Sequence, residues 1–135
     1  MTATTRKALL LHGDGLARRV LRRTLATHGF EVVTAEDGER GLTALLDELL
    51  DLDVLVIDAD LPIRDGWSLL RLIRSAGGER DLRIVVVGRE LDAARCAQLR
   101  WLGADAALDV AEGAEAVAAA AEGTASTPWA AAACA

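Results

Sequence analysis

The chain has 135 residues, of which 52% are hydrophobic and 27% charged, and its formal net charge is −6. This length fits one folded domain but not two, and the composition is that of a globular protein. No apolar run approaches the roughly 18 to 20 residues that cross a bilayer, and the first residues lack the cleavage site of a secretory signal. We therefore expect a cytoplasmic protein with no membrane contact.

The charge is unevenly distributed along the chain. Residues 1–30 carry six basic and one acidic side chain, which gives +5, so the rest of the chain carries −11 to reach −6. Four of the arginines fall within residues 18–23, where they could bind an acidic partner or nucleic acid. Solvated helix faces carry the same pattern, and the negative net charge argues against bulk nucleic-acid binding. We predict no nucleic-acid partner.

Short apolar stretches alternate with longer amphipathic ones. The former predict strands over residues 8–11, 31–34, 54–57, 84–87 and 104–108. The latter predict helices over residues 16–28, 39–50, 67–75, 90–102 and 112–122. Three of the strand stretches are continuously apolar, which is typical of parallel strands covered by helices on both faces. The alternation predicts a doubly wound five-stranded parallel α/β sheet, in one domain over residues 1–122.

The chain changes character at Gly123. Residues 123–135 are rich in alanine, and we expect them to form a disordered tail or linker stub. The fifth predicted helix is expected to be marginal, because it contains Gly113 near its start and only Val117 as a large apolar contact.

Ligands of doubly wound sheets bind at the carboxyl ends of the strands, so the residues just after each strand are the candidate site. They are His12, Gly13 and Asp14 after the first strand, Asp58 and Asp60 after the third, Gly88 and Arg89 after the fourth, and Val110 after the fifth.

Residues 58–66 read Asp-Ala-Asp-Leu-Pro-Ile-Arg-Asp-Gly. This string resembles the phosphoacceptor loop of CheY-like response-regulator receiver domains, in which an aspartate ends the third strand and a Leu/Met-Pro-x-x-Asp-Gly turn follows. Residues 34–42 and 103–105 resemble further segments of the family. The resemblance implies the flavodoxin-like strand order 2-1-3-4-5, a role in two-component phosphorelay signalling, and Asp58 as the residue that accepts phosphate from a histidine kinase.

The resemblance also implies supporting groups that this chain lacks. The family holds Mg²⁺ with an acidic pair after the first strand, and places a Ser/Thr hydroxyl after the fourth strand and Lys-Pro after the fifth. The corresponding residues here are His12 and Gly13, Gly88, and Val110 and Ala111, and the family's aromatic switch position is Ala107. Phosphoryl transfer needs a cation and fixed donors around the transferred oxygens. We therefore expect inefficient Mg²⁺-dependent phosphorylation and no cofactor, with Asp14, Asp58 and Asp60 as the remaining candidate metal ligands.

We expect His12 to lie beside Asp58, because the first and third strands are neighbours in the implied sheet. His12 or Arg89, or both, would then take the place of Mg²⁺ and lysine in a permanent ion pair with Asp58. Arg89 could equally be a solvated loop residue. Asp14 could reach a metal through water, or could be an acid at a helix N-terminus.

Residues 13–18 link a strand to a helix and superficially match a dinucleotide-binding fingerprint, but Arg18 replaces its third glycine. A nucleotide- or flavin-binding enzyme fragment is therefore a less favoured alternative. The chain shows no other nucleophile–base constellation, and we predict that it is not an enzyme.

Trp101 is the candidate residue for a partner surface. Leu99 and Leu102 fit the buried face of the fourth helix, which leaves Trp101 near the surface, whereas Trp67 should point into the core. Receiver domains commonly meet partners through the fourth helix, fifth strand and fifth helix, and tryptophan is enriched at binding hot spots. We expect Trp101 to contribute to a homodimer or partner contact, with partial burial under a neighbouring segment as the alternative.

The function predicted from these residues is a degenerate receiver domain that acts by protein–protein interaction, with a histidine kinase or a downstream effector as its partner. The alternative is a conventional receiver domain that is phosphorylated at Asp58.

Overall fold

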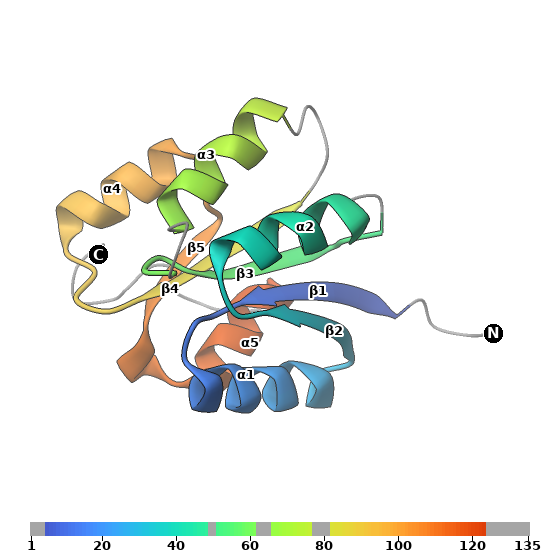
Figure 1. Ribbon diagram of the computed structural model, residues 1–135. Coiled ribbons are helices and arrows are strands. Elements are labelled where there is room, and N and C mark those ends of the chain that lie inside the picture. The colour runs from blue at the N-terminus through green and yellow to red at the C-terminus, as the bar shows by residue number, and fades with distance from the viewer. Residues whose placement is uncertain (1–4, 49–50, 62–65, 77–81, 124–135) are drawn as a thin grey trace.

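The computed structural model describes residues 5–48, 51–61, 66–76 and 82–123. Five parallel strands form one sheet in the order β2-β1-β3-β4-β5 (Figure 1), which confirms the predicted fold. The strands are β1 (Arg6–Leu11), β2 (Phe30–Ala35), β3 (Val54–Asp58), β4 (Arg83–Gly88) and β5 (Ala106–Asp109).

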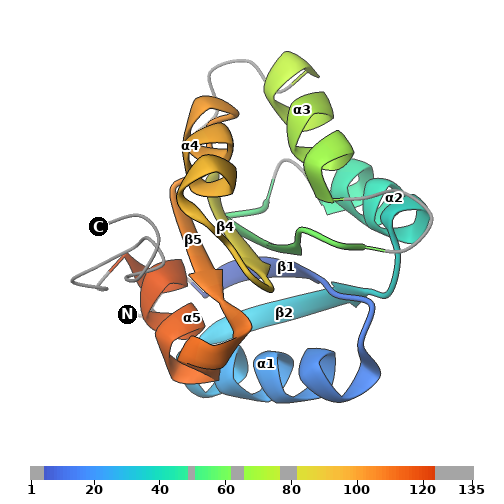
Figure 2. The ribbon, with the colours of Figure 1, turned by 90° about the vertical axis from the view of Figure 1, so that its left-hand side faces the viewer.

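Helices cover both faces of the sheet. They are α1 (Gly15–Thr27), α2 (Gly38–Glu48), α3 (Gly66–Ala76), α4 (Ala93–Trp101) and α5 (Ala114–Glu122), with a 3-10 turn, η1 (Val110–Glu112), before α5. Helices α1 and α5 lie on one face, and α2, α3 and α4 lie on the other (Figure 2).

The alternation of side chains along the strands divides the core into two layers. In β1, Leu9 and Leu11 pack with the helices α2 to α4, whereas Ala8 and Leu10 pack with α1 and α5. All four are fully buried, because successive side chains of a strand point to opposite faces and both faces are covered. This explains why the strands of the sequence read as continuously apolar.

Two helices begin later than the sequence pattern predicts. Glu90 has a positive φ of 53°, and the Asp92 side chain accepts a hydrogen bond from the Arg95 N–H, so α4 begins at Ala93 rather than at residue 90. Gly113 has a φ of 89°, outside the right-handed helical region, so α5 begins only after it.

Helix α5 is better buried than expected. Four of its residues, Val117, Ala118, Ala120 and Ala121, are at most 2% exposed, because their small side chains allow a close approach to the sheet. Its last carbonyls are also satisfied: the Arg83 Nε–H donates to Ala120 O (2.6 Å) and Arg6 Nη2 donates to Ala121 O (3.2 Å). The expectation of a marginal fifth helix was therefore wrong.

Two expectations fall on segments that lie outside the described residues. These are the alanine-rich tail, apart from Gly123, which ends α5 with a φ of 81°, and residues 62–65 of the loop after β3. In the parts of the chain that are described, no helix is long and apolar enough to cross a membrane.

Candidate functional site

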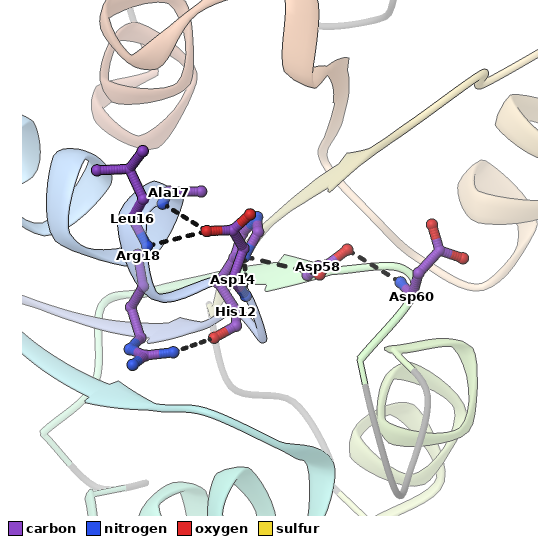
Figure 3. Close-up of polar contacts among 7 residues, drawn as sticks. All are labelled: His12, Asp14, Leu16, Ala17, Arg18, Asp58 and Asp60. Carbon is purple, nitrogen blue, oxygen red and sulfur yellow. Dashed lines mark hydrogen bonds and ion pairs between the residues drawn. The ribbon is translucent and has the colours of Figure 1, made fainter.

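The carboxyl ends of β1 and β3 bring four of the predicted site residues together, namely His12, Asp14, Asp58 and Asp60 (Figure 3). Leu11 and Ile57 are register partners, so the next residues along each strand, His12 and Asp58, lie at neighbouring strand ends. Asp58 ends β3 and also pairs in register with Val87 of β4. Its side chain is 15% exposed, so the carboxylate is reachable from outside.

The two carboxylate oxygens of Asp58 have different neighbours. Oδ1 accepts a hydrogen bond from the backbone N–H of Asp60 at 3.0 Å, a local bond that orients the carboxylate at the strand end. Oδ2 lies 3.7 Å from Nδ1 of His12. This separation is within ion-pair reach but beyond hydrogen-bond distance.

His12 is held firmly in place beside Asp58. The residue is only 6% exposed, its N–H donates to Ala35 O (3.1 Å), and Arg18 Nη1 donates to its carbonyl (2.8 Å). Its Nδ1 accepts a hydrogen bond from the backbone N–H of Asp14 at 3.1 Å. A nitrogen that accepts such a bond carries no proton, so the expected ion pair with Asp58 would require this bond to break.

Asp14 is the N-cap of α1. Its Oδ1 accepts hydrogen bonds from the backbone N–H groups of Leu16 (2.9 Å) and Ala17 (3.1 Å). The hydrogen bond from Ala17, followed by that from Leu16, holds the pKa of the Asp14 carboxyl below its usual value. The positive charge of Arg89 lowers this pKa further. Of the two interpretations of Asp14, the structure supports the acid at a helix N-terminus.

The space beside Gly88, at the end of β4, is already filled. A Cβ atom placed on Gly88 would lie 2.9 Å from Leu91 Cδ2 and 3.4 Å from Ala59 Cβ. Leu91 is buried, with 4% exposure, and belongs to the core layer under α2 to α4. A side chain at this position, where the resemblance implies a hydroxyl, would therefore require Leu91 to shift.

The arginine that reaches the acidic loop is Arg95 rather than Arg89. Arg95 Nη2 lies 3.6 Å from Asp60 Oδ1, Nη1 donates to the Arg89 carbonyl (2.9 Å), and the guanidinium stands 5.6 Å from the centre of the Trp67 ring. The Arg89 side chain is exposed. Trp67 is only partly buried, so the expectation that it points into the core holds in part.

Sequence reasoning missed Arg95 because it placed the start of α4 three residues too early. With the helix beginning at Ala93, Arg95 falls in the first turn, next to the strand ends. The signal that could have found it is Asp92, a strong N-cap residue.

The other predicted residues lie at the rim of the site or away from it. Gly13 is exposed between β1 and α1, and Val110, 42% exposed, opens η1 after β5. Trp101 ends α4 and is 85% exposed, as its place in the helix predicted.

The residues at the strand ends do not fit a Mg²⁺ ion, which prefers an octahedral set of oxygen ligands. Asp14 caps α1, Asp60 faces Arg95, and His12 offers a nitrogen where the family carries a carboxylate. Across the described parts of the chain, no group of three or more His, Cys, Asp and Glu side chains could hold a metal ion.

A five-stranded sheet of this order is the flavodoxin-like α/β architecture, and Asp58 lies at the carboxyl ends of its strands, where such sheets bind their ligands. The chain belongs to the response regulator receiver domain family, whose model matches residues 9–123. It is accordingly a receiver domain of two-component signal transduction.

Two curated relatives with similar sequences are named as transcriptional regulators. The chain is 34% identical over 86 residues to the transcriptional regulatory protein CpxR of Escherichia coli strain K12, which covers 64% of this chain and 36% of CpxR. It is 32% identical over 105 residues to the probable transcriptional regulator ycf27 of Cyanophora paradoxa, which covers 78% of this chain and 42% of that protein. The chain thus spans about two fifths of the length of these relatives.

Solved structures confirm the fold. The chemotaxis response regulator CheY4 of Vibrio cholerae has a TM-score of 0.80 at 21% identity, with 90% of this chain and 99% of that chain covered. The receiver domain of the response regulator NarL from Mycobacterium tuberculosis has a TM-score of 0.78 at 23% identity, with the same coverage of both chains.

Proposed function

We propose that this receiver domain acts by binding a protein partner in a two-component pathway, without efficient Mg²⁺-dependent phosphorylation of Asp58. The observation that carries the proposal is the position of His12. Its buried imidazole lies 3.7 Å from Asp58, at the strand end where the family carries its acidic pair. A cation placed there would meet a fixed ring nitrogen instead of carboxylate oxygens.

The surroundings of Gly88 support the same proposal. Gly88 has no hydroxyl, Leu91 crowds the position that a Cβ atom on Gly88 would take, and Val110 carries no charge that could stabilise the transferred phosphoryl oxygens. A lost hydrogen bond to a charged group costs about 1.5 to 3 kcal/mol. Each such loss slows a reaction by roughly 10- to 150-fold if the bond acts in the transition state.

Magnesium binding provides the first test. Amide signals of Asp60 and Gly88 in ¹H–¹⁵N spectra should show no saturable shift as Mg²⁺ is raised to several millimolar. The double variant His12→Asp/Gly13→Asp restores the family's acidic pair and should gain such a shift. A saturable shift in the parent that disappears in Asp58→Asn would contradict the proposal.

A conventional receiver that is phosphorylated at Asp58 is the second candidate. It is favoured by the carboxylate itself, which ends β3 and keeps a side-chain exposure of 15%. Incubation with acetyl phosphate and Mg²⁺, followed by a mass measurement of the parent and of Asp58→Asn, separates the two candidates.

We further propose that Trp101 contributes to the partner surface. Trp101 is 85% exposed at the end of α4, and tryptophan is among the residues enriched at binding hot spots. The candidates are a second copy of the chain, a histidine kinase or a downstream effector in the cytoplasm. Sedimentation of the parent and of Trp101→Ala tests the homodimer: a dimeric parent and a monomeric variant would support it, and an unchanged mass would oppose it.

A further inference from the structure

An apolar cavity lies between α1 and α5, beside His12. Its volume is about 310 Å³, at the lower end of the range of small-molecule sites. The wall comes from α1, the end of β4, η1 and α5, and most of its side chains are apolar, including Leu16, Val20, Val110 and Val117.

Three exposed apolar side chains converge on this cavity. Leu16 is 71% exposed, Val20 48% and Val110 42%, and all three contribute to the wall. Leu16 and Val20 are four residues apart on α1 and therefore share one face of the helix. Single exposed apolar residues are ordinary, but several around one hollow mark a surface that a ligand can cover.

His12 is part of the cavity wall, and its ring carries a hydrogen-bond donor that has no partner among the described residues. Its Nδ1 accepts from the Asp14 N–H, so the proton of the neutral ring belongs on Nε2. Nε2 has no hydrogen-bond partner among the described residues. Every fully buried polar side-chain atom of these residues has a partner, so Nε2 is not fully buried. His12 as a whole is only 6% exposed, and it is part of the cavity wall.

The charges around His12 determine which kind of ligand group can accept a hydrogen bond from its Nε2–H. Arg18 donates to the His12 carbonyl but is not part of the cavity lining. Asp14 is the one Asp, Glu, Lys or Arg residue in the cavity lining, and Asp58 lies 3.7 Å from the imidazole, so these carboxylates oppose a negatively charged group in the cavity. A neutral carbonyl avoids this repulsion. The volume holds about ten groups the size of a water molecule, at roughly 30 Å³ each.

We propose that the cavity between α1 and α5 binds an uncharged organic ligand with an apolar body of about ten non-hydrogen atoms and one carbonyl, which accepts a hydrogen bond from Nε2 of His12. The inference does not depend on whether Asp58 is phosphorylated.

Matched probes test the two parts of the proposal. The uncharged ketone 4-phenylbutan-2-one carries the carbonyl, butylbenzene lacks it, and 3-phenylpropanoate adds a negative charge. Titrated into ¹⁵N-labelled protein, the ketone should shift the amides of Ala17, Gly113 and Val117. It should bind about fivefold more tightly than butylbenzene, the ratio expected for one neutral hydrogen bond. The propanoate should bind more weakly than the ketone.

Variants locate the binding and the donor. Val20→Glu places a charge in the cavity wall, and Leu46→Glu is its control at an exposed position of α2 outside the cavity. Val20→Glu should abolish the shifts and Leu46→Glu should leave them unchanged. In His12→Phe the ketone should lose its advantage over butylbenzene. Ketone shifts that are absent in the parent, or that survive Val20→Glu, would overturn the cavity, and an advantage retained in His12→Phe would overturn the donor.

Discussion

The imidazole of His12 faces the carboxylate of Asp58 across 3.7 Å, with its Nδ1 already engaged by the backbone N–H of Asp14. Two neighbouring strand ends fix this relationship, since Leu11 and Ile57 are in register. The site therefore presents a carboxylate beside a buried imidazole, with a helix cap next to both. Each of these groups is held by local bonds that do not need a metal.

The first prediction concerns the proton on His12. In ring ¹⁵N spectra recorded at pH 8, His12 should be the Nε2–H tautomer, because Nδ1 accepts the Asp14 hydrogen bond. Asp58→Asn should leave this tautomer unchanged, since no hydrogen bond joins the two side chains. A proton on Nδ1 that is lost in Asp58→Asn would instead restore the ion pair suggested by the sequence.

The packing at Gly88 gives a prediction about stability. Gly88→Ser should lower the free energy of unfolding by about 1 to 3 kcal/mol, because the new side chain meets Leu91. Combining it with Leu91→Ala should destabilise less than the sum of the two single changes. Gly15→Ser is the control, since its Cβ would meet only an Arg18 side-chain nitrogen at 3.8 Å. Urea unfolding measures all four variants, and additive effects would show that Leu91 does not fill this space.

A histidine far from the site predicts a pH dependence. His28, after the end of α1, contacts Glu115 (Nε2 to Oε2, 2.7 Å) and Glu122 through Nδ1, and both glutamates belong to α5. The hydrogen bond with Glu115, then that with Glu122, raises the pKa of His28. Because the folded-state value is the higher one, this contribution to stability is full below the unfolded-state pKa of about 6.5 and is lost as the pH rises through the folded-state value.

The matched variant is His28→Gln, which cannot become charged. Between pH 6 and pH 9 the parent should lose more stability than His28→Gln, as measured by urea unfolding at each pH. Parallel pH profiles for the two proteins would show that the contact between α1 and α5 carries no titrating charge.

The sequence pattern was sufficient to predict a doubly wound parallel sheet with Asp58 at a strand end, because continuous apolar strands and strand-end loops depend on local pattern. The strand order came from the resemblance of residues 58–66 to receiver domains, and the sheet confirms it. The pattern was insufficient where the backbone leaves the common conformations. Because Glu90 has a positive φ, α4 begins three residues later than the pattern predicted. Arg95 therefore lies in the first turn of α4, where the sequence did not place it. The alanines of α5 are too small to be recognised as core residues from the sequence. The structure shows that they are buried because the helix lies close to the sheet.

We propose that Asp58 has lost the supporting groups that efficient phosphorylation needs. The most direct measurement is incubation of the parent and of Asp58→Asn with acetyl phosphate and Mg²⁺, followed by intact-mass analysis under acidic conditions. The treated and untreated parent should have the same mass distribution. A gain of one phosphoryl group in the parent that is absent from Asp58→Asn would contradict this proposal and establish a conventional receiver.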